Sequence, residues 1–257
     1  MSRIQTLSYD NWRKFKADAF VDLYETGQFH RGRYLFRGQM SADWKLSTSF
    51  DRWYNELHRD PQKRTETAEH LLAAFRKECE QLDIHREVRD NQLLLTVLAQ
   101  HYGLPTRLLD WSESIYIAAF FAFCEAISGG QAGKPAGANK PPGVAIWALN
   151  QQSGIWQSEI GVSIVDASSM GNSRLRNQFG KFTISRTPFD CLEDYVKNIP
   201  DEQSGDSEAA LYQIVIPVSE AKAALADLDA MGISHSRIFP EAVGCAMAAK
   251  TRVLLED

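Results

Sequence analysis

The sequence predicts an α+β fold with a mixed, mostly antiparallel sheet core and flanking helices. Segments with apolar residues at helical spacing and short β-branched runs follow one another without the regular strand–helix alternation of a parallel α/β protein. The length of 257 residues and the apolar content of 44% suffice for a full hydrophobic core. We expect one domain over residues 1–257, with a helical N-terminal segment over 1–30, a core over 31–250 and a flexible inserted loop over 128–143.

The first third of the chain predicts helices around one strand. Asp10 has the position of a capping residue, and apolar residues recur at helical spacing after it. A short apolar strand is expected over 34–38, and the alternation over 44–50 predicts a second extended segment. Residues 61–88 are typical of a long polar helix with one apolar face.

The central segments carry clear boundary signals. Gly103 can provide the left-handed residue that ends a helix, and Asp110 or Ser112 is expected to cap the helix that follows. The expected elements here are a helix over 91–101, a strand over 106–109 and a strongly apolar helix over 115–127.

The remaining elements follow a segment without periodicity. Residues 128–143 are rich in Gly and Pro, which is typical of a surface loop. Beyond it, β-branched runs predict strands and apolar spacing predicts helices. The expected strands cover 144–149, 182–184 and 211–217, and the expected helices cover 219–231 and 241–250.

Charge, cysteine content and hydropathy limit the class of protein. A net charge of −5 argues against a generally basic, sequence-blind nucleic-acid binder, although a local basic cleft remains compatible with it. The four cysteines form no ligand spacing, so we expect reduced thiols and no metal site. The polar start lacks a signal-peptide core, and the longest apolar run contains Glu125 and is too short to span a bilayer. We expect a cytoplasmic protein without a membrane anchor.

Residues 100–112 concentrate polar side chains between a Gly-x-Pro turn and an apolar run. Arg107 and Asp110 lie three residues apart in a Leu-Leu-Trp context, and burying either charge alone would cost several kcal/mol. Two interpretations follow. Either Arg107 and Asp110 form a buried pair that braces a turn, or the segment lines a polar cleft at the end of a strand.

Four segments in order carry a family pattern. Residues 34–39 end in Phe-Arg-Gly-Gln, and residues 100–111 read Gln-His-Tyr-Gly-Leu-Pro-Thr-Arg-Leu-Leu-Asp-Trp. Residues 172–182 read Asn-Ser-Arg-Leu-Arg-Asn-Gln-Phe-Gly-Lys-Phe, and residues 239–244 read Phe-Pro-Glu-Ala-Val-Gly. Together they resemble the FRG family, which is named for the Phe-Arg-Gly tripeptide. The resemblance implies a single FRG-type domain.

The FRG resemblance implies a more distant similarity to ADP-ribosyltransferases, in fold and in activity. Those enzymes begin their core with an aromatic-Arg-Gly strand whose Arg holds NAD, followed by a strand with a Ser/Thr-rich corner that runs into a helix. Residues 106–112 and the apolar helix after them have that shape. The family also carries a catalytic Glu on a later strand, where this chain has Gly180. Asp110 and Glu241 are the alternative carboxylates, with an Arg107 partner and a helix N-terminal acid as their respective structural roles.

The candidate site residues follow from these segments. Guanidinium binds phosphate through paired hydrogen bonds, and His can orient or protonate a ligand. The candidate catalytic residues are Arg37, His101, Asp110 and Glu241. The candidate cofactor-binding residues are Phe36, Gly38, Gln39, Gln100, Tyr102, Thr106, Arg107, Ser112 and Gln178. A basic rim for phosphate or nucleic acid is expected from Arg174, Arg176 and Lys181.

Three functions remain open at this point. The resemblance favours an NAD-consuming ADP-ribosyltransferase that modifies a macromolecule, with nucleic acid slightly favoured over protein, in a bacterial toxin or phage-defence effector. NAD would be its substrate, and an antitoxin or regulator protein a further partner. The alternatives are a non-catalytic nucleotide or nucleic-acid binding module and a nuclease or other hydrolase. The sequence lacks a metal-ligand cluster, a Gly-x-Ser-x-Gly elbow and a phosphate loop, which counts against the hydrolase.

Overall fold

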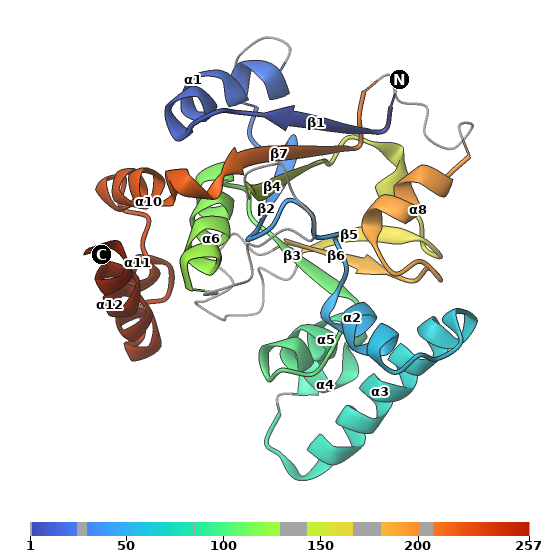
Figure 1. The fold of residues 1–257 in the computed structure, drawn as a ribbon. Helices are drawn as coiled ribbons and strands as arrows, with labels where there is room; N and C mark the ends of the chain where they lie inside the picture. The colour runs from blue at the N-terminus through green and yellow to red at the C-terminus, as the bar shows by residue number, and fades with distance from the viewer. Residues whose placement is uncertain are drawn as a thin grey trace.

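The computed structural model describes residues 2–24, 30–84, 86–128, 143–166, 181–200 and 208–256. Two small sheets form the centre of the molecule, with helices packed around them and a group of helices projecting to one side (Figure 1). The α+β class with mixed sheets and flanking helices is therefore confirmed.

The larger sheet has the strand order β1-β7-β4-β2. Its strands are β1 (Ile4–Ser8), β7 (Leu211–Pro217), β4 (Gly143–Asn150) and β2 (Tyr34–Gln39). Only the β1–β7 pair is parallel among these pairings. The strand β4 is apolar almost throughout because alternate side chains enter two different cores, one on each face of the sheet.

The smaller sheet is antiparallel, with the order β3-β6-β5. Its strands are β3 (Leu108–Trp111), β6 (Lys181–Ser185) and β5 (Val162–Asp166). The edge strands of the two sheets meet where Phe36 and Ser112 exchange two backbone N–H···O hydrogen bonds, each 2.7 Å long. This junction brings the end of β2 against the end of β3.

Helices cover both faces of the larger sheet. The main core lies between one face and three helices, α1 (Trp12–Leu23), α6 (Ile115–Ser128) and α10 (Ala221–Ala230). Next to α6 and α10 lie α11 (His235–Ile238) and α12 (Ala242–Glu256) (Figure 1). The opposite face packs against the smaller sheet and α8 (Leu192–Asn198).

Four helices between β2 and β3 form the group that projects below the sheets in Figure 1. They are α2 (Ser49–Glu56), α3 (Arg64–Glu78), α4 (Arg86–Asp90) and α5 (Gln92–His101). Asn91 caps α5, and Gly103 follows its end with φ 87°, as expected. Arg64 is the buried residue of α3, so this helix is attached to the rest of the protein mainly through its first turn.

Several expectations about individual elements are wrong. Residues 44–50 do not form a strand, because the Thr48 side chain accepts a hydrogen bond from the Asp51 N–H and starts α2 there. The long helix expected over 61–88 ends at Glu78 and continues only as a short 3-10 turn. Asn11, not Asp10, caps α1.

The expected boundary at the start of α6 also differs. Ser114 accepts a hydrogen bond from the Ile117 N–H and so has the capping role that was expected of Asp110 or Ser112. The strands β1 and β5 were not expected at all. Most of the expected loop over 128–143 lies outside the described residues. Within the described part of the chain, no helix has the length and apolar character needed to cross a membrane.

Candidate functional site

A pocket of about 200 Å³ opens at the junction of the two sheets. The end of β2, the end of β3 and one face of α6 form its walls. The lining residues are Phe36, Arg37, Gly38, Asp110, Trp111, Ser112, Ala118, Phe121 and Glu125. The tripeptide of β2 and the end of the central polar block thus come together in one pocket, although they are far apart in the sequence.

Arg37 is the cationic group that lines this pocket, and Asp110 holds it. Its Nη1 atom donates to the Asp110 backbone oxygen at 2.8 Å and lies 3.5 Å from Asp110 Oδ2. No residue in the described ranges accepts a hydrogen bond from the buried Nε atom of Arg37. The guanidinium is therefore fixed at one end and retains donor capacity for a ligand.

A chain of hydrogen bonds positions Asp110 in turn. Gln100 Nε2 donates to Asp110 Oδ1 at 2.7 Å, and the Thr106 hydroxyl donates to the Gln100 side-chain oxygen. Gln100 is at the end of α5, whereas Thr106 precedes β3. The polar residues Gln100, Thr106 and Asp110 of the central block therefore act together to orient Arg37.

Gly38 is required by packing. A Cβ atom at this position would lie 2.0 Å from the Ala118 carbonyl oxygen and 2.8 Å from the Ala122 nitrogen. Because both are backbone atoms of α6, a side chain at 38 would push the helix away from β2. The absence of a side chain at 38 therefore brings α6 close enough to form a wall of the pocket.

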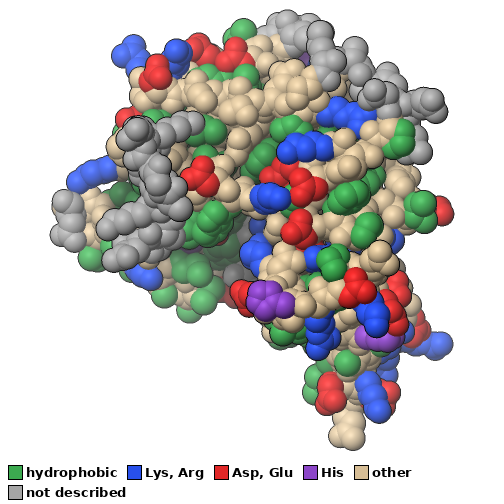
Figure 2. All heavy atoms as spheres, turned by 45° about the vertical axis from the view of Figure 1, so that its right-hand side comes forward, with side chains coloured by type: hydrophobic (Ala, Val, Ile, Leu, Met, Phe, Trp, Pro, Cys, Tyr) green, Lys and Arg blue, Asp and Glu red, His purple; other side chains and the backbone are tan. Residues whose placement is uncertain are grey.

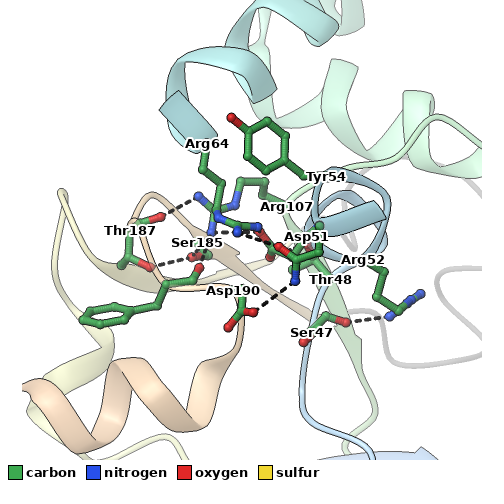
Figure 3. A network of polar contacts seen from close by, with 12 residues as sticks. Ser47, Thr48, Asp51, Arg52, Tyr54, Arg64, Arg107, Ser185, Thr187 and Asp190 are labelled. Carbon is green, nitrogen blue, oxygen red and sulfur yellow. Dashed lines mark hydrogen bonds and ion pairs between the residues drawn. The ribbon is translucent and has the colours of Figure 1, made fainter. Parts of the chain in front are cut away.

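Arg107 does not line the Arg37 pocket, and its ion-pair partner is Asp51, not Asp110. Figure 3 shows Arg107 and Arg64 converging on Asp51, whose Oδ1 lies 3.3 Å from Arg107 Nη2 and 3.0 Å from Arg64 Nη1. Arg107 also donates to the backbone oxygens of Thr187 at 2.6 Å and Phe189 at 2.9 Å.

This buried network is structural. Its three charged side chains are 2–5% exposed, so each needs the others. Burial lowers the pKa of Arg107, and the Asp51 charge opposes that shift. The network attaches α2 and α3 to the smaller sheet. Arg107 therefore does not contribute to the Arg37 pocket. Of the two interpretations of Arg107 and Asp110, the one that pairs them with each other is wrong.

Glu125 is a pocket residue whose role the sequence did not reveal. The side chain of Glu125 is open to the pocket. Enough protein surrounds the carboxyl group to raise its pKa by loss of hydration, and the positive charges of Arg37 and Arg52 partly oppose this rise. The signal was present as a single acid in the apolar run that forms α6. In the sequence, this acid argues against a membrane span but gives no indication of a pocket.

Arg52 adds a second positive charge near the site. It extends from α2 away from Arg64 and Arg107, and its Nη1 atom donates to the Ser47 backbone oxygen at 2.6 Å (Figure 3). Burial of part of the side chain lowers the pKa of Arg52, and the neighbouring Arg37 charge lowers it further. An anion between Arg37 and Arg52 would relieve this repulsion.

Other candidate residues have structural or surface positions. Gln39 is buried, donates to the Lys45 backbone oxygen and accepts a hydrogen bond from Trp147 Nε1, so it is bonded within the protein and does not line the pocket. His101 and Tyr102 are exposed at the end of α5, and their rings contact each other outside the pocket lining. Ser112 contributes its backbone to the sheet junction, and its Oγ atom accepts a hydrogen bond from the Ser114 N–H.

The second candidate carboxylate, Glu241, does not line the pocket. It is exposed at the start of α12, where its backbone oxygen accepts hydrogen bonds from Gly244 and Cys245. A Cβ atom at Gly244 would lie 2.0 Å from the Phe239 backbone oxygen. The Phe-Pro-Glu-x-x-Gly segment therefore closes the turn between α11 and α12.

The expected basic rim is only partly described. Lys181 begins β6, and its Nζ atom lies 3.6 Å from Glu113 Oε1, which neutralises part of its charge. Arg174, Arg176 and Gln178 lie outside the described residues. On the face drawn in Figure 2, basic and acidic side chains are intermixed over the described surface.

One cluster among the described residues has ligand-type atoms close enough together for a metal ion. The ligand atoms of Asp190, Cys191 and Asp194 lie within 4.8 Å of one another. Lys45 forms an ion pair with Asp194 at 3.1 Å, and burial raises the pKa of Cys191 to about 12. These residues do not line the Arg37 pocket, and we assign the cluster no role.

The comparison with protein families identifies the segment that carries the pocket. Residues 32–130 match the family model of the FRG domain, and this range extends from the start of β2 to the end of α6. The comparisons with curated proteins and with solved structures found no match. Every residue that lines the Arg37 pocket lies within the segment that matches the FRG domain model.

Proposed function

We propose that this protein binds NAD at the Arg37 pocket and transfers its ADP-ribose group to a macromolecule. The observation that carries the proposal is the Phe36–Ser112 backbone pair, which joins the Phe-Arg-Gly strand to the strand–Ser–helix corner. In ADP-ribosyltransferases, which the sequence distantly resembles, two segments of these kinds follow each other in the same order. The meeting of the two segments in one pocket supports a common ligand site.

The chemistry of Arg37 supports a phosphate-bearing ligand. Asp110 fixes one nitrogen of the guanidinium, and no described residue accepts from the buried Nε. Guanidinium donors match phosphate oxygens in pairs, and a second cation at Arg52 adds to the attraction. A pyrophosphate between these two arginines would satisfy both charges.

The size of the pocket limits how NAD would bind. Pockets that enclose drug-sized ligands have volumes of about 300–1,000 Å³. The Arg37 pocket has about 200 Å³, so it would enclose one part of the dinucleotide and leave the rest on the surface. The open part of the ligand is where a large acceptor could approach.

Nucleic acid is the first acceptor to test. Arg174 and Arg176 precede β6 in the sequence, and local basic residues can position phosphates even on an acidic protein. The pairing of Lys181 with Glu113 weakens this preference, and protein remains the alternative acceptor. An enzyme that consumes NAD or modifies an essential polymer would harm its host, which supports a role as a toxin or defence effector.

The test is nicotinamide release from NAD by the purified protein, with and without cell lysate. We expect Arg37→Ala to lower release at least 100-fold. Its free energy of unfolding should change by only about 0–1 kcal/mol, because an ion pair with a half-exposed carboxylate such as Asp110 contributes little. Arg86→Ala is the matched control, because Arg86 is 93% exposed and pairs with Asp90 on the same helix.

Label transfer from NAD carrying a labelled adenylate, followed by separate nuclease and protease digestion, identifies the acceptor. Label lost only to protease would contradict the preference for nucleic acid. If the wild-type protein binds NAD but neither releases nicotinamide nor transfers label, the protein is a nucleotide-binding module. The contacts of Asp110 favour this binding-module alternative. One of its carboxylate oxygens faces Arg37 and the other accepts a hydrogen bond from Gln100, so neither is left for the reacting sugar.

A further inference from the structure

We propose that Glu125 is the catalytic carboxylate of the Arg37 pocket. This inference rests on the proposed function and names a catalytic acid that the sequence motifs did not identify. Of the two acids expected from the sequence, one is bonded to its neighbours within the pocket and the other lies outside it. Asp110 accepts from Gln100 through one oxygen and faces Arg37 with the other, and Glu241 does not line the pocket.

The position of Glu125 follows from the packing of α6 against β2. Ala118, Phe121 and Glu125 are spaced by three and four residues, so they share one face of the helix, and all three line the pocket. The missing side chain at Gly38 allows that face to approach the strand closely. The two walls of the pocket therefore carry Glu125 and Arg37 respectively.

The carboxyl group of Glu125 is available to a ligand. Within the described ranges, no hydrogen bond and no ion pair joins it to another residue, in contrast to Asp110. Its charged neighbours are Arg37 on β2 and Arg52 on α2, with Asp110 on β3 lining the same pocket. Both arginines would be occupied by ligand phosphate, which leaves the Glu125 carboxylate to face the sugar.

Partial loss of hydration suits Glu125 to proton transfer. Removal of water raises its pKa, and the positive charges of Arg37 and Arg52 oppose the rise. A bound phosphate would cancel that opposition and raise the pKa further, towards the pH at which a carboxylate is an effective base. Binding of an anion should therefore be accompanied by fractional proton uptake at Glu125, and the fraction that stays deprotonated is the form that acts in the chemical step.

The chemical step uses the carboxylate in two ways. The bond between ribose C1′ and the nicotinamide nitrogen breaks, and its electron pair neutralises the pyridinium. The positive charge that develops on the ribose is stabilised by the negative charge of Glu125, as carboxylates do in glycoside cleavage. An acceptor hydroxyl or amine then forms a bond to C1′, and its proton passes to Glu125 and from there to water.

The experiment compares Glu125→Gln with Glu241→Gln, an acid on the protein surface that does not line the pocket. With water and total cellular RNA or protein as acceptors, we expect Glu125→Gln to lower kcat for nicotinamide release about 100-fold or more. KM for NAD and calorimetric binding of ADP-ribose should stay within about threefold. Glu241→Gln should leave both unchanged.

Two further readouts separate catalysis from folding. Calorimetry in buffers of different ionisation enthalpy should show proton uptake on ADP-ribose binding in the wild type and none in Glu125→Gln. The variant should also fold. The pKa of Glu125 is raised in the folded protein, so at pH values above the ordinary pKa of Glu the charged side chain lowers the stability of the folded state. The neutral Gln of the variant removes this destabilisation.

The outcomes distinguish this inference from the proposed function. If Glu125→Gln keeps kcat while Arg37→Ala loses it, Glu125 is not catalytic and the ADP-ribosyl transfer stands. If the wild type binds ADP-ribose but cleaves no NAD, the proposed function fails and the catalytic role of Glu125 fails with it. Loss of both binding and kcat in Glu125→Gln would make the residue a ligand contact and overturn its assignment as the base.

Discussion

The substitution Asp51→Asn tests whether Arg64 and Arg107 stabilise the fold independently of the Arg37 pocket. Asp51 is 2% exposed and is the carboxylate that both Arg64 and Arg107 contact. Asn keeps the size of the side chain but removes the charge, which leaves two buried guanidinium groups without their shared anion. Breaking a buried ion pair in this way costs about 3–5 kcal/mol.

That cost should be easy to measure. For a protein of this size, each kcal/mol lowers Tm by about 2–4 °C, so we expect a decrease of about 6–20 °C. In urea the midpoint should fall while the slope stays constant, because the surface exposed on unfolding does not change. Thermal melting by circular dichroism and urea titration would both report the change.

Asp110→Asn is the matched control, because the Asp110 side chain is 54% exposed and pairs with Arg37. It should change stability by only about 0–1 kcal/mol. A Tm of Asp51→Asn within 2 °C of the wild type would refute the reasoning. So would an Asp110→Asn protein that loses as much stability as Asp51→Asn, since Asp110 would then be the acid that supports a buried arginine.

Two other predictions concern packing and pH. Gly38→Ala should destabilise the protein by about 1–3 kcal/mol or more and lower ligand affinity. The reason is that a Cβ atom 2.0 Å from the Ala118 backbone oxygen forces α6 away from β2. A urea midpoint equal to that of the wild type would contradict this prediction. Burial lowers the pKa of His235, which lies 4.8 Å from the Phe120 ring, so the unfolded chain takes up a proton first on acidification. Stability should therefore fall as pH drops through the ordinary pKa of His near 6.5, and melting curves between pH 7.5 and about 5 should show a smaller loss for His235→Gln.

The resemblance and the local signals identified much of the site in advance. The Phe-Arg-Gly strand, the helix that Gly103 ends and the apolar helix after Ser112 all lie close to their expected positions. These features are local, because a cap, a left-handed glycine or a β-branched run acts on its own few residues. Arg37 and Asp110 are at the ends of expected strands, and the structure brings those ends together in one pocket.

Contacts between distant segments could not be predicted in the same way. The strand β1 forms because it pairs with β7, about 200 residues later, and residues 4–8 alone carry little signal for it. Residues 44–51 carry two competing local signals, an alternation that is typical of a strand and the cap spacing of Thr48 and Asp51, and the cap prevails in the folded protein.

The partner of each charged residue was decided by the tertiary structure. Arg107 and Asp110 are three residues apart, so in an extended chain their side chains point to opposite faces, and each pairs with a residue far away in the sequence. The sequence by itself determined which polar residues gather near β3 and which family the segment resembles. Only the packing of α6 on β2 at Gly38 decided that Glu125 lines the pocket, because the position of a side chain across a helix–strand contact depends on both elements at once.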